Sequence, residues 1–222
     1  MNEDRQFDSI PLNDQGSLSL VELIYGVLFN PVNTFRRISE NPPLLHGFLI
    51  FFGVVTLTSL TNTLIPPNIS DVAELNTVLA RTRPLIGIVG ALISLIGWFL
   101  GAGLFQLLAE FFGGKGRAVG VLTVLALAGI PKVLVIPFQV INYFLAGALY
   151  VRIPAIASSV IAFIWWAVLL VIGLREIQEF SVARSVASLL IPLGILGLII
   201  IIFTLVLAGL IVPLMNSVFP PV

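Results

Sequence analysis

The chain has 222 residues, of which 58% are hydrophobic and only 10% are charged. Soluble domains carry about 25% charged residues, so a chain this apolar cannot cover its surface with groups that water solvates. The eleven basic residues balance eleven acidic ones, which leaves no basic field for nucleic acid, and the lack of cysteine excludes disulfides and thiolate metal sites. The composition therefore predicts an integral membrane protein.

The N-terminal part of the chain divides into a polar tail and a helical segment. Residues 1–16 are polar and acidic, and we predict a disordered tail there rather than a secretory signal. After the tail, Ser19 and Glu22 have the spacing of a capping box, and Pro31 follows an asparagine as it does at the start of many helices. Residues 17–41 are therefore predicted to form two short helices.

Two placements of these helices are open. Each helix is too short to cross about 30 Å of hydrocarbon at about 1.5 Å per residue. They are apolar on one face and end in Arg36 and Arg37, which suits the lipid headgroup interface on the cytoplasmic side. The alternative is a helical hairpin that packs on the cytoplasmic end of the membrane domain. The candidate contacts to lipid headgroups are Arg36, Arg37, Lys115 and Arg117.

Residues 42–222 are predicted to form a five-helix transmembrane domain. Their apolar runs are long and continuous, and in lipid a helix satisfies its own backbone hydrogen bonds. The predicted spans cover about 44–65, 84–112, 118–146, 155–174 and 186–212. The fold class is therefore all-α and polytopic, with an interfacial amphipathic segment before the first span.

Basic residues near the span ends predict the orientation. With the N-terminus inside, the cytoplasmic side holds Arg5, Arg36, Arg37, Lys115, Arg117, Arg175 and Arg184, and the other side holds Arg81, Arg83 and Arg152. We therefore expect a multi-pass protein of the cell (inner) membrane with a cytoplasmic N-terminus and an external C-terminus. An Asn68-Ile69-Ser70 triplet on the outer side matches a glycosylation acceptor, which matters only in a host that glycosylates.

The residue types that membrane enzymes need are missing from the predicted spans. The single histidine, His46, cannot form a zinc site, and no second histidine exists to complete a catalytic triad. No aspartate lies within a span, so an intramembrane aspartyl protease is excluded. The chain is therefore predicted not to be an enzyme and to need no cofactor or metal.

Lys132 is the one charged residue deep inside a predicted span. If the third span is one helix, Lys132 lies about 20 Å deep, where a charge costs about 2.5 kcal/mol or more and marks a functional site. Glu110 is its natural partner, although it lies near the cytoplasmic end of the second span, at a different depth. In the alternative, the span ends near Ile136, Pro137 starts an interfacial segment and Lys132 snorkels outward.

The segment around Lys132 also predicts a broken helix. Pro131 removes one backbone hydrogen bond and frees a carbonyl about one turn earlier. Transporters use such breaks to bind ions or solutes, whereas a simple kink fits a helix to its neighbours. A passage for solutes would need polar side chains, and the candidates are Gln106, Gln139 and Asn142.

Glycines mark a helix contact and a turn. Gly97 and Gly101 lie four residues apart in the second span, a spacing that lets helix backbones approach closely, either inside the bundle or in a homodimer. The Gly113-Gly114-Lys115-Gly116 stretch lacks the first glycine and the Ser/Thr of a phosphate loop, and no strand precedes it. It therefore predicts a tight turn between the second and third spans.

The order of these motifs points to a known family. The carrying features are Leu28-Phe29-Asn30-Pro31-Val32-Asn33-Thr34-Phe35, the Gly-Gly-Lys-Gly turn after a long second span, Ala128-Gly129-Ile130-Pro131 in the third span and Trp165 in the fourth. This order resembles the Yip1 family of five-span proteins, and the resemblance covers the chain from about Leu20 onward.

The resemblance implies the five-span topology and little about activity. Eukaryotic relatives associate with prenylated small GTPases in vesicle traffic and carry an Asp-Leu-Tyr-Gly-Pro motif. This chain matches that motif only loosely at Tyr25, Gly26 and Pro31, with different spacing and without the aspartate. GTPase binding is therefore not carried over.

Two functional hypotheses follow. The first is a non-enzymatic membrane-organising or adaptor protein that acts through the 20–38 segment and the loops around Lys115 and Arg175. The second is a small transporter, channel or lipid scramblase with its pathway at the broken third span. The expected partners are membrane lipids, and other membrane proteins or a second copy of the chain are further candidates, but nucleic acid is not.

Overall fold

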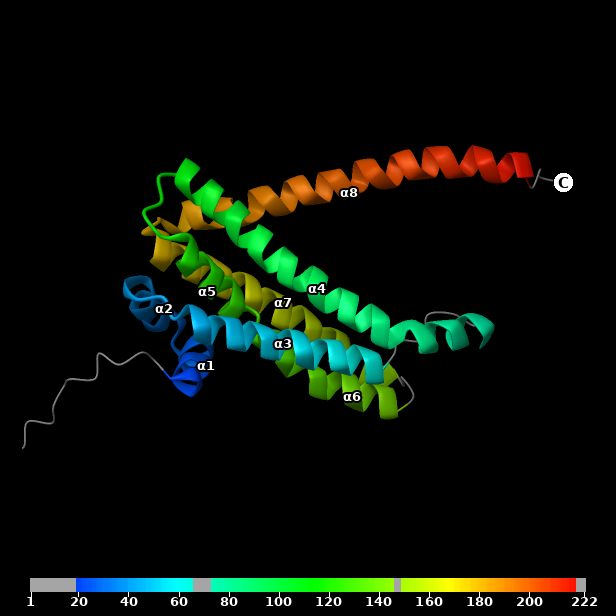
Figure 1. The fold of residues 1–222 in the computed structure, drawn as a ribbon, viewed down its shortest axis with the longest axis horizontal. Helices are drawn as coiled ribbons and strands as arrows, with labels where there is room; N and C mark the ends of the chain where they lie inside the picture. Colours follow the sequence, from blue (N-terminus) through cyan, green and yellow to red (C-terminus); the bar gives the residue numbers. More distant parts are fainter. Residues whose placement is uncertain (1–18, 66–72, 146–148, 219–222) are drawn as a thin grey trace, which may run out of the picture.

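The computed structural model describes residues 19–65, 73–145 and 149–218, and these residues form helices joined by short turns. In chain order the elements are α1 (Leu20–Phe29), α2 (Pro31–Glu40), α3 (Leu44–Leu64), α4 (Ala73–Phe111), α5 (Ala118–Ala128), the 3₁₀ helix η1 (Ile130–Val135), α6 (Ile136–Phe144), α7 (Leu149–Gln178) and α8 (Val182–Val218). Figure 1 shows them along one long bundle. The predicted disordered tail (1–16) and the Asn68-Ile69-Ser70 triplet lie outside the described residues.

Within the described residues, five helical segments are long and apolar enough to cross a membrane, which confirms the predicted all-α, five-span fold. These segments are Leu44–Leu64, Arg81–Phe111, Ala118–Phe144, Arg152–Gln178 and Val182–Gly209. Several helices extend beyond the predicted spans; α4 starts at Ala73 and contains Pro84, and α7 starts at Leu149 and contains Pro154. Hydropathy detects only the part of a helix that lies in hydrocarbon. Helical turns in the headgroup region are therefore not included in spans predicted from hydropathy.

The third span is the centre of the bundle. In its window, 61% of the residues are buried, compared with 17% or less in the other four spans. The first part of this span, α5, contacts α3, α4 and α7. By contrast, α8 contacts α7 and α4 and then leaves the other helices over most of its length (Figure 1).

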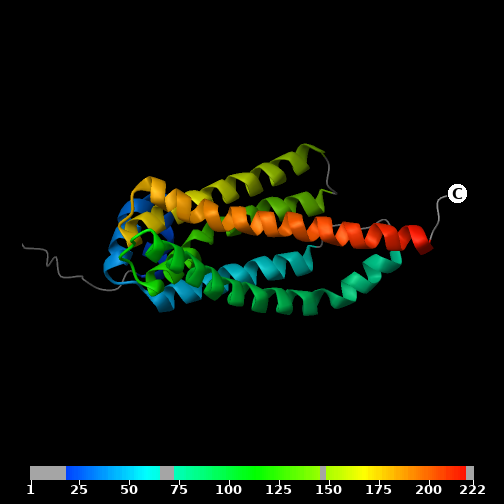
Figure 2. The same cartoon turned by 90° about the horizontal axis from the view of Figure 1, so that it is seen from above.

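The two ends of the bundle differ. The hairpin end holds α1, α2, the α4–α5 turn and the α7–α8 turn, whereas the far end is where α3 and α6 end and α7 begins (Figures 1 and 2). The α1–α2 hairpin packs on the bundle through Leu23, Val27, Phe35 and Ile38, all of which are fully buried. Of the two placements that the sequence left open, α2 adopts the one in which it packs on the end of the membrane domain. Its apolar face lies against α7 and α5.

A small residue on α7 makes room for this packing. A Cβ built on Gly173 would lie 2.5 Å from Val124 Cγ1 and 3.3 Å from Phe35 Cε1. Because Val124 and Phe35 are both fully buried, neither has free space to move into. Gly173 thus lets α2, α5 and α7 meet at one point.

Of the two contacts predicted for the glycine pair, the structure bears only on the one inside the bundle. Within the described chain, no atom lies within 4 Å of a Cβ built on Gly97, and for Gly101 the nearest such atom is Leu125 Cδ1 at 4.0 Å. The expected close packing inside the bundle is therefore absent at Gly97. α4 instead meets its neighbours through Trp98, which stacks on Phe51 with ring centroids 4.6 Å apart and donates from Nε1 to the Leu122 carbonyl at 3.0 Å.

Candidate functional site

The break in the third span creates the environment of the first candidate site. α5 ends at Ala128, and the chain continues as the 3₁₀ helix η1, in which the Lys132 amide donates to the Gly129 carbonyl at 3.1 Å. This tighter winding follows from Pro131, which cannot donate the hydrogen bond that would continue α5. α6 then resumes the span and packs on α7, so the span continues past Ile136 and Pro137 instead of ending there.

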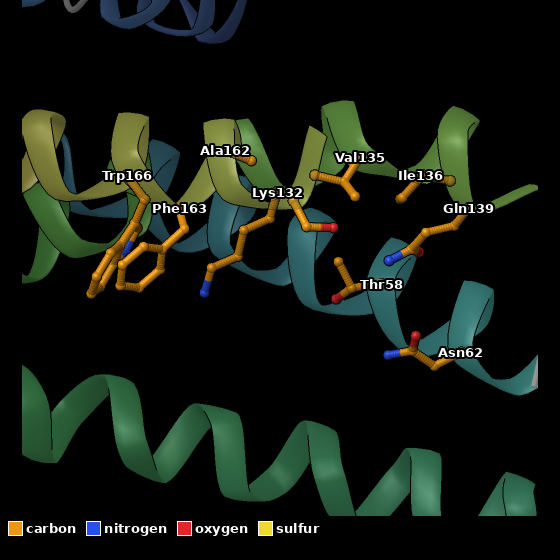
Figure 3. Close-up of a pocket in the computed structure, with 10 residues that line it drawn as sticks. Thr58, Asn62, Lys132, Val135, Ile136, Gln139, Ala162, Phe163 and Trp166 are labelled. Atoms are coloured by element: carbon orange, nitrogen blue, oxygen red, sulfur yellow. The ribbon is translucent and has the colours of Figure 1, made fainter. Parts of the chain in front are cut away.

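Lys132 lines a cavity of about 270 Å³ between α3, η1–α6 and α7. Its lining residues are Thr58, Asn62, Lys132, Val135, Ile136, Gln139, Ser159, Ala162, Phe163 and Trp166. Figure 3 shows the Lys132 side chain reaching into this space beside Phe163 and Trp166, with Thr58 and Asn62 one turn apart on α3. The polar side chains of three helices therefore gather at one place in an otherwise apolar region.

Lys132 has no acidic partner in this cavity. Its Nζ lies 5.8 Å from the centroid of the Trp166 ring, a cation–π contact, and no acidic residue is among the lining residues. Glu110 is not its partner, because its carboxylate accepts from Gln106 Nε2 at 3.0 Å at the hairpin end. Gln106 likewise does not lie in the polar path near Lys132, whereas Gln139 does.

A second cavity of about 540 Å³ adjoins the first toward the far end. It is lined by Gln139, Asn142, Arg152, Ala155, Ile156, Ser159, Val160 and Phe163, and it shares Gln139, Ser159 and Phe163 with the Lys132 cavity. Arg152 forms no ion pair with a described residue. The Asn142 side-chain oxygen is buried without a hydrogen-bond partner among the described residues. Asn142 is one of the polar residues predicted for a pathway, whereas Arg152 was predicted only to mark the external end of a span.

The hairpin end carries a separate polar network. Gln178, which is 1% exposed, accepts from the Gly116 amide at 2.8 Å and donates to Gln106 Oε1 at 2.9 Å. Gln106 in turn donates to the Gly116 carbonyl at 3.1 Å and to Glu110. This network fixes the turn between α4 and α5 against the end of α7.

The glycines of this turn are needed for its packing. A Cβ built on Gly114 would lie 2.6 Å from Gln178 Oε1, and one built on Gly116 would overlap the Ile177 carbonyl oxygen. Gly113 adopts a φ of +79°, in the left-handed region that glycine favours. The structure thus shows the expected turn, while Gln178, its central contact, was missed because a lone glutamine at a span end carries no spacing signal.

The candidate headgroup contacts divide into paired and unpaired residues. Arg36 Nε lies 3.3 Å from Glu176, and Lys115 Nζ lies 3.2 Å from Glu179. Arg37 and Arg117 form no ion pair with the described residues. Within the described chain, the charges of these two arginines are offset only by carboxylates that form no ion pair with them, Glu22 near Arg37 and the three glutamates that line a pocket with Arg117.

The start of α1 is stabilised by the predicted capping box. The Ser19 amide and hydroxyl donate to Glu22 Oε2 at 2.9 and 3.0 Å, and the Glu22 amide donates back to the Ser19 hydroxyl at 3.3 Å. These hydrogen bonds hold the pKa of Glu22 below its usual range, so its carboxylate stays charged under mildly acidic conditions. This cap fixes where α1 begins.

α1 carries apolar side chains on both its inward and its outward side, and the charged Glu22 is exposed in its first turn. Leu23 and Val27 face the bundle and are fully buried, whereas Val21, Tyr25 and Phe29 face outward with exposed fractions of 75%, 64% and 71%. The Tyr25 and Phe29 rings lie in contact, with centroids 4.7 Å apart. In Figure 1, α1 lies to the side of the bundle, at the same end as α2.

The arrangement contains no metal centre within the described residues, since no three His, Cys, Asp or Glu side chains come together there.

A family model for the Yip1 domain matches residues 25–205. No curated protein and no solved structure matches the chain.

Proposed function

Because the chain belongs to the Yip1 family, we propose that it is a non-enzymatic protein of the cell membrane that organises lipids or partner proteins at its hairpin end. The N-terminus and the hairpin end lie on the cytoplasmic side in this proposal, in keeping with the excess of basic residues there. The chain crosses the membrane five times and ends on the other side.

The outward face of α1 is the observation that carries this proposal. Burying a large apolar side chain contributes about 1.5–3 kcal/mol, so leaving Val21, Tyr25 and Phe29 in water would be costly. At the same end of the bundle, Leu44 and Leu45 at the start of α3 are also exposed, and they belong to a helix apolar enough to cross a membrane. The occupant that fits these exposed apolar side chains is the membrane itself, with α1 lying in its interface.

Charge at the hairpin end complements this placement. Arg37 on α2 and Arg117 at the start of α5 have no ion-pair partner among the described residues and lie at the same end as α1. A basic side chain near an anionic lipid surface contributes about 1 kcal/mol. α1 and the two arginines together would hold this end of the protein at an anionic leaflet.

The double variant Arg37→Gln/Arg117→Gln is expected to reduce the enrichment of anionic lipid around the protein by about tenfold or more at low salt, since each charge contributes about 1 kcal/mol. The chain has no cysteine, so a single cysteine in place of Asn33 can carry a donor dye. Energy transfer from this dye to labelled anionic lipids measures the enrichment. The difference should vanish near 1 M salt, where the Debye length is about 3 Å.

The matched control for this measurement is Arg36→Gln/Lys115→Gln. It removes the same net charge, but from side chains that already pair with Glu176 and Glu179. The control should lose clearly less enrichment. An equal loss in both variants would show that only net charge matters and would refute the role of the two unpaired arginines.

A second candidate function rests on the Lys132 cavity, a cation without an acidic partner at membrane depth. Such a residue suits a small transporter, channel or lipid scramblase with its pathway along the broken third span. Reconstitution into liposomes separates the two candidates. Scrambling or leakage that Lys132→Met abolishes would favour the second candidate, and a folded protein without either activity would favour the first.

A further inference from the structure

The cavity around Arg152 and Asn142 lies where α6 ends and α7 begins, at the edges of the third and fourth apolar spans. Asn142 is two residues before the end of α6, and Arg152 is three residues after the start of α7, so each lies within about 5 Å of its helix end. Both helix ends are at the far end of the bundle, opposite α1 and α2. This cavity therefore opens where the far leaflet carries its phosphates.

The groups in the cavity define the chemistry of a ligand. Arg152 is a cation without an ion-pair partner among the described residues, and no acidic residue is among the lining residues, so an anion is favoured. An arginine guanidinium matches the oxygens of a phosphate with two parallel hydrogen bonds. Asn142 lines the cavity, and its Oδ1 is buried and unpaired among the described residues. A rotation of the amide would bring Oδ1 toward the cavity, where a ligand can supply the missing donor.

The remaining lining residues suit the body of a lipid. Gln139 and Ser159 offer polar contacts on the side toward Lys132, and Ala155, Ile156, Val160 and Phe163 offer an apolar wall. The Ser159 hydroxyl donates to the Ala155 carbonyl at 2.9 Å, so its lone pairs are free to accept a further hydrogen bond. A volume of about 540 Å³ is within the range of small-ligand sites.

We propose that this cavity binds the headgroup of a phospholipid from the far leaflet, with Arg152 holding the phosphodiester and Asn142 accepting a hydrogen bond from the headgroup alcohol or amine. Ethanolamine and glycerol headgroups carry such a donor, whereas the quaternary ammonium of choline does not. Free phosphate has the anionic oxygens but lacks the glycerol and acyl parts that the apolar wall would contact. The site lies at the opposite end from the proposed action of α1, so it goes beyond that function.

Lipid binding to the purified full chain, measured by native mass spectrometry, tests this site with four probes: phosphatidylethanolamine, phosphatidylglycerol, phosphatidylcholine and inorganic phosphate. The first two should bind at least about fivefold more tightly than phosphatidylcholine, and inorganic phosphate should not displace them. Arg152→Gln should weaken binding of both by about tenfold, since a charge-assisted hydrogen bond is lost. Asn142→Leu should remove the preference over phosphatidylcholine and keep phosphate-dependent binding.

A control variant keeps the result specific. Arg81→Gln removes an exposed cation that lines neither cavity. It should bind ethanolamine and glycerol lipids as the unmodified chain does. Unchanged binding in Arg152→Gln, equal binding of phosphatidylcholine by the unmodified chain, or displacement by inorganic phosphate would each overturn the proposal. None of these results tests the proposed position of α1 in the membrane interface, so the two proposals can fail independently.

Discussion

Replacing Gly173 with alanine is expected to destabilise the protein by about 1–3 kcal/mol, the usual cost of overpacking a buried site. The added methyl group would lie 2.5 Å from Val124 Cγ1 and 3.3 Å from Phe35 Cε1. Because both neighbours are fully buried, α2 or α5 must shift to make room. The free energy of unfolding in mixed micelles measures this loss, which should exceed the gain of up to about 1 kcal/mol in helix propensity.

Gly194→Ala on α8 is the matched control for this change. Within the described chain no atom lies within 4 Å of a Cβ built there, so the methyl group meets only lipid. We expect a neutral or slightly stabilising effect. If the two variants had the same stability, the close meeting of α2, α5 and α7 at Gly173 would be refuted.

Replacing Gln178 with leucine is expected to cost about 1–3 kcal/mol, because it leaves buried hydrogen-bonding groups without partners. The Gly116 amide loses its acceptor and Gln106 loses its donor, although the new side chain has a similar size. The α4–α5 turn should loosen first. Hydrogen exchange at the Gly116 amide should therefore speed up more than exchange in α5.

Gln139→Leu is the matched control, because it makes the same change at a glutamine that lines the two cavities. Gln139 takes no part in the hydrogen bonds that join Gln178 to Gly116 and Gln106. Gln139→Leu should leave both stability and Gly116 exchange nearly unchanged. A Gln178→Leu protein with the stability and Gly116 exchange rate of the unmodified chain would show that the network does not fix the turn.

The fold could be predicted from the sequence because its strongest patterns follow from what a lipid environment requires of the backbone. Apolar runs of about 20 residues must be helices in hydrocarbon, and Pro131 must interrupt the hydrogen bonding of its helix. The capping box at Ser19 was predictable for a similar reason, since it depends on residues only three apart. These features are local along the chain and need no knowledge of which helices are neighbours.

Contacts between helices could not be predicted in this way. Gly97 has the spacing of a packing motif, yet α4 meets α3 through Trp98 and Phe51, whose pairing depends on the rotation of both helices. Gln106 was placed near Lys132 because both are polar residues in spans, but it lies at the hairpin end with Gln178. The amphipathic pattern of residues 17–41 likewise left two placements open, and only tertiary packing shows that α2 is buried while α1 turns Phe29 outward.

The central claim is that this end of the protein lies in the membrane interface. Measuring the depth of α1 in a bilayer tests it most directly. The chain has no cysteine, so single cysteines at Val21, Tyr25 and Phe29 can carry spin labels, with the exposed Asn33 on α2 as the aqueous control. In liposomes, we predict that labels at the first three positions are accessible to oxygen and shielded from a water-soluble nickel relaxant, while the label at position 33 shows the reverse. Labels at positions 21, 25 and 29 that are as accessible to nickel as the label at position 33 would contradict the proposed function.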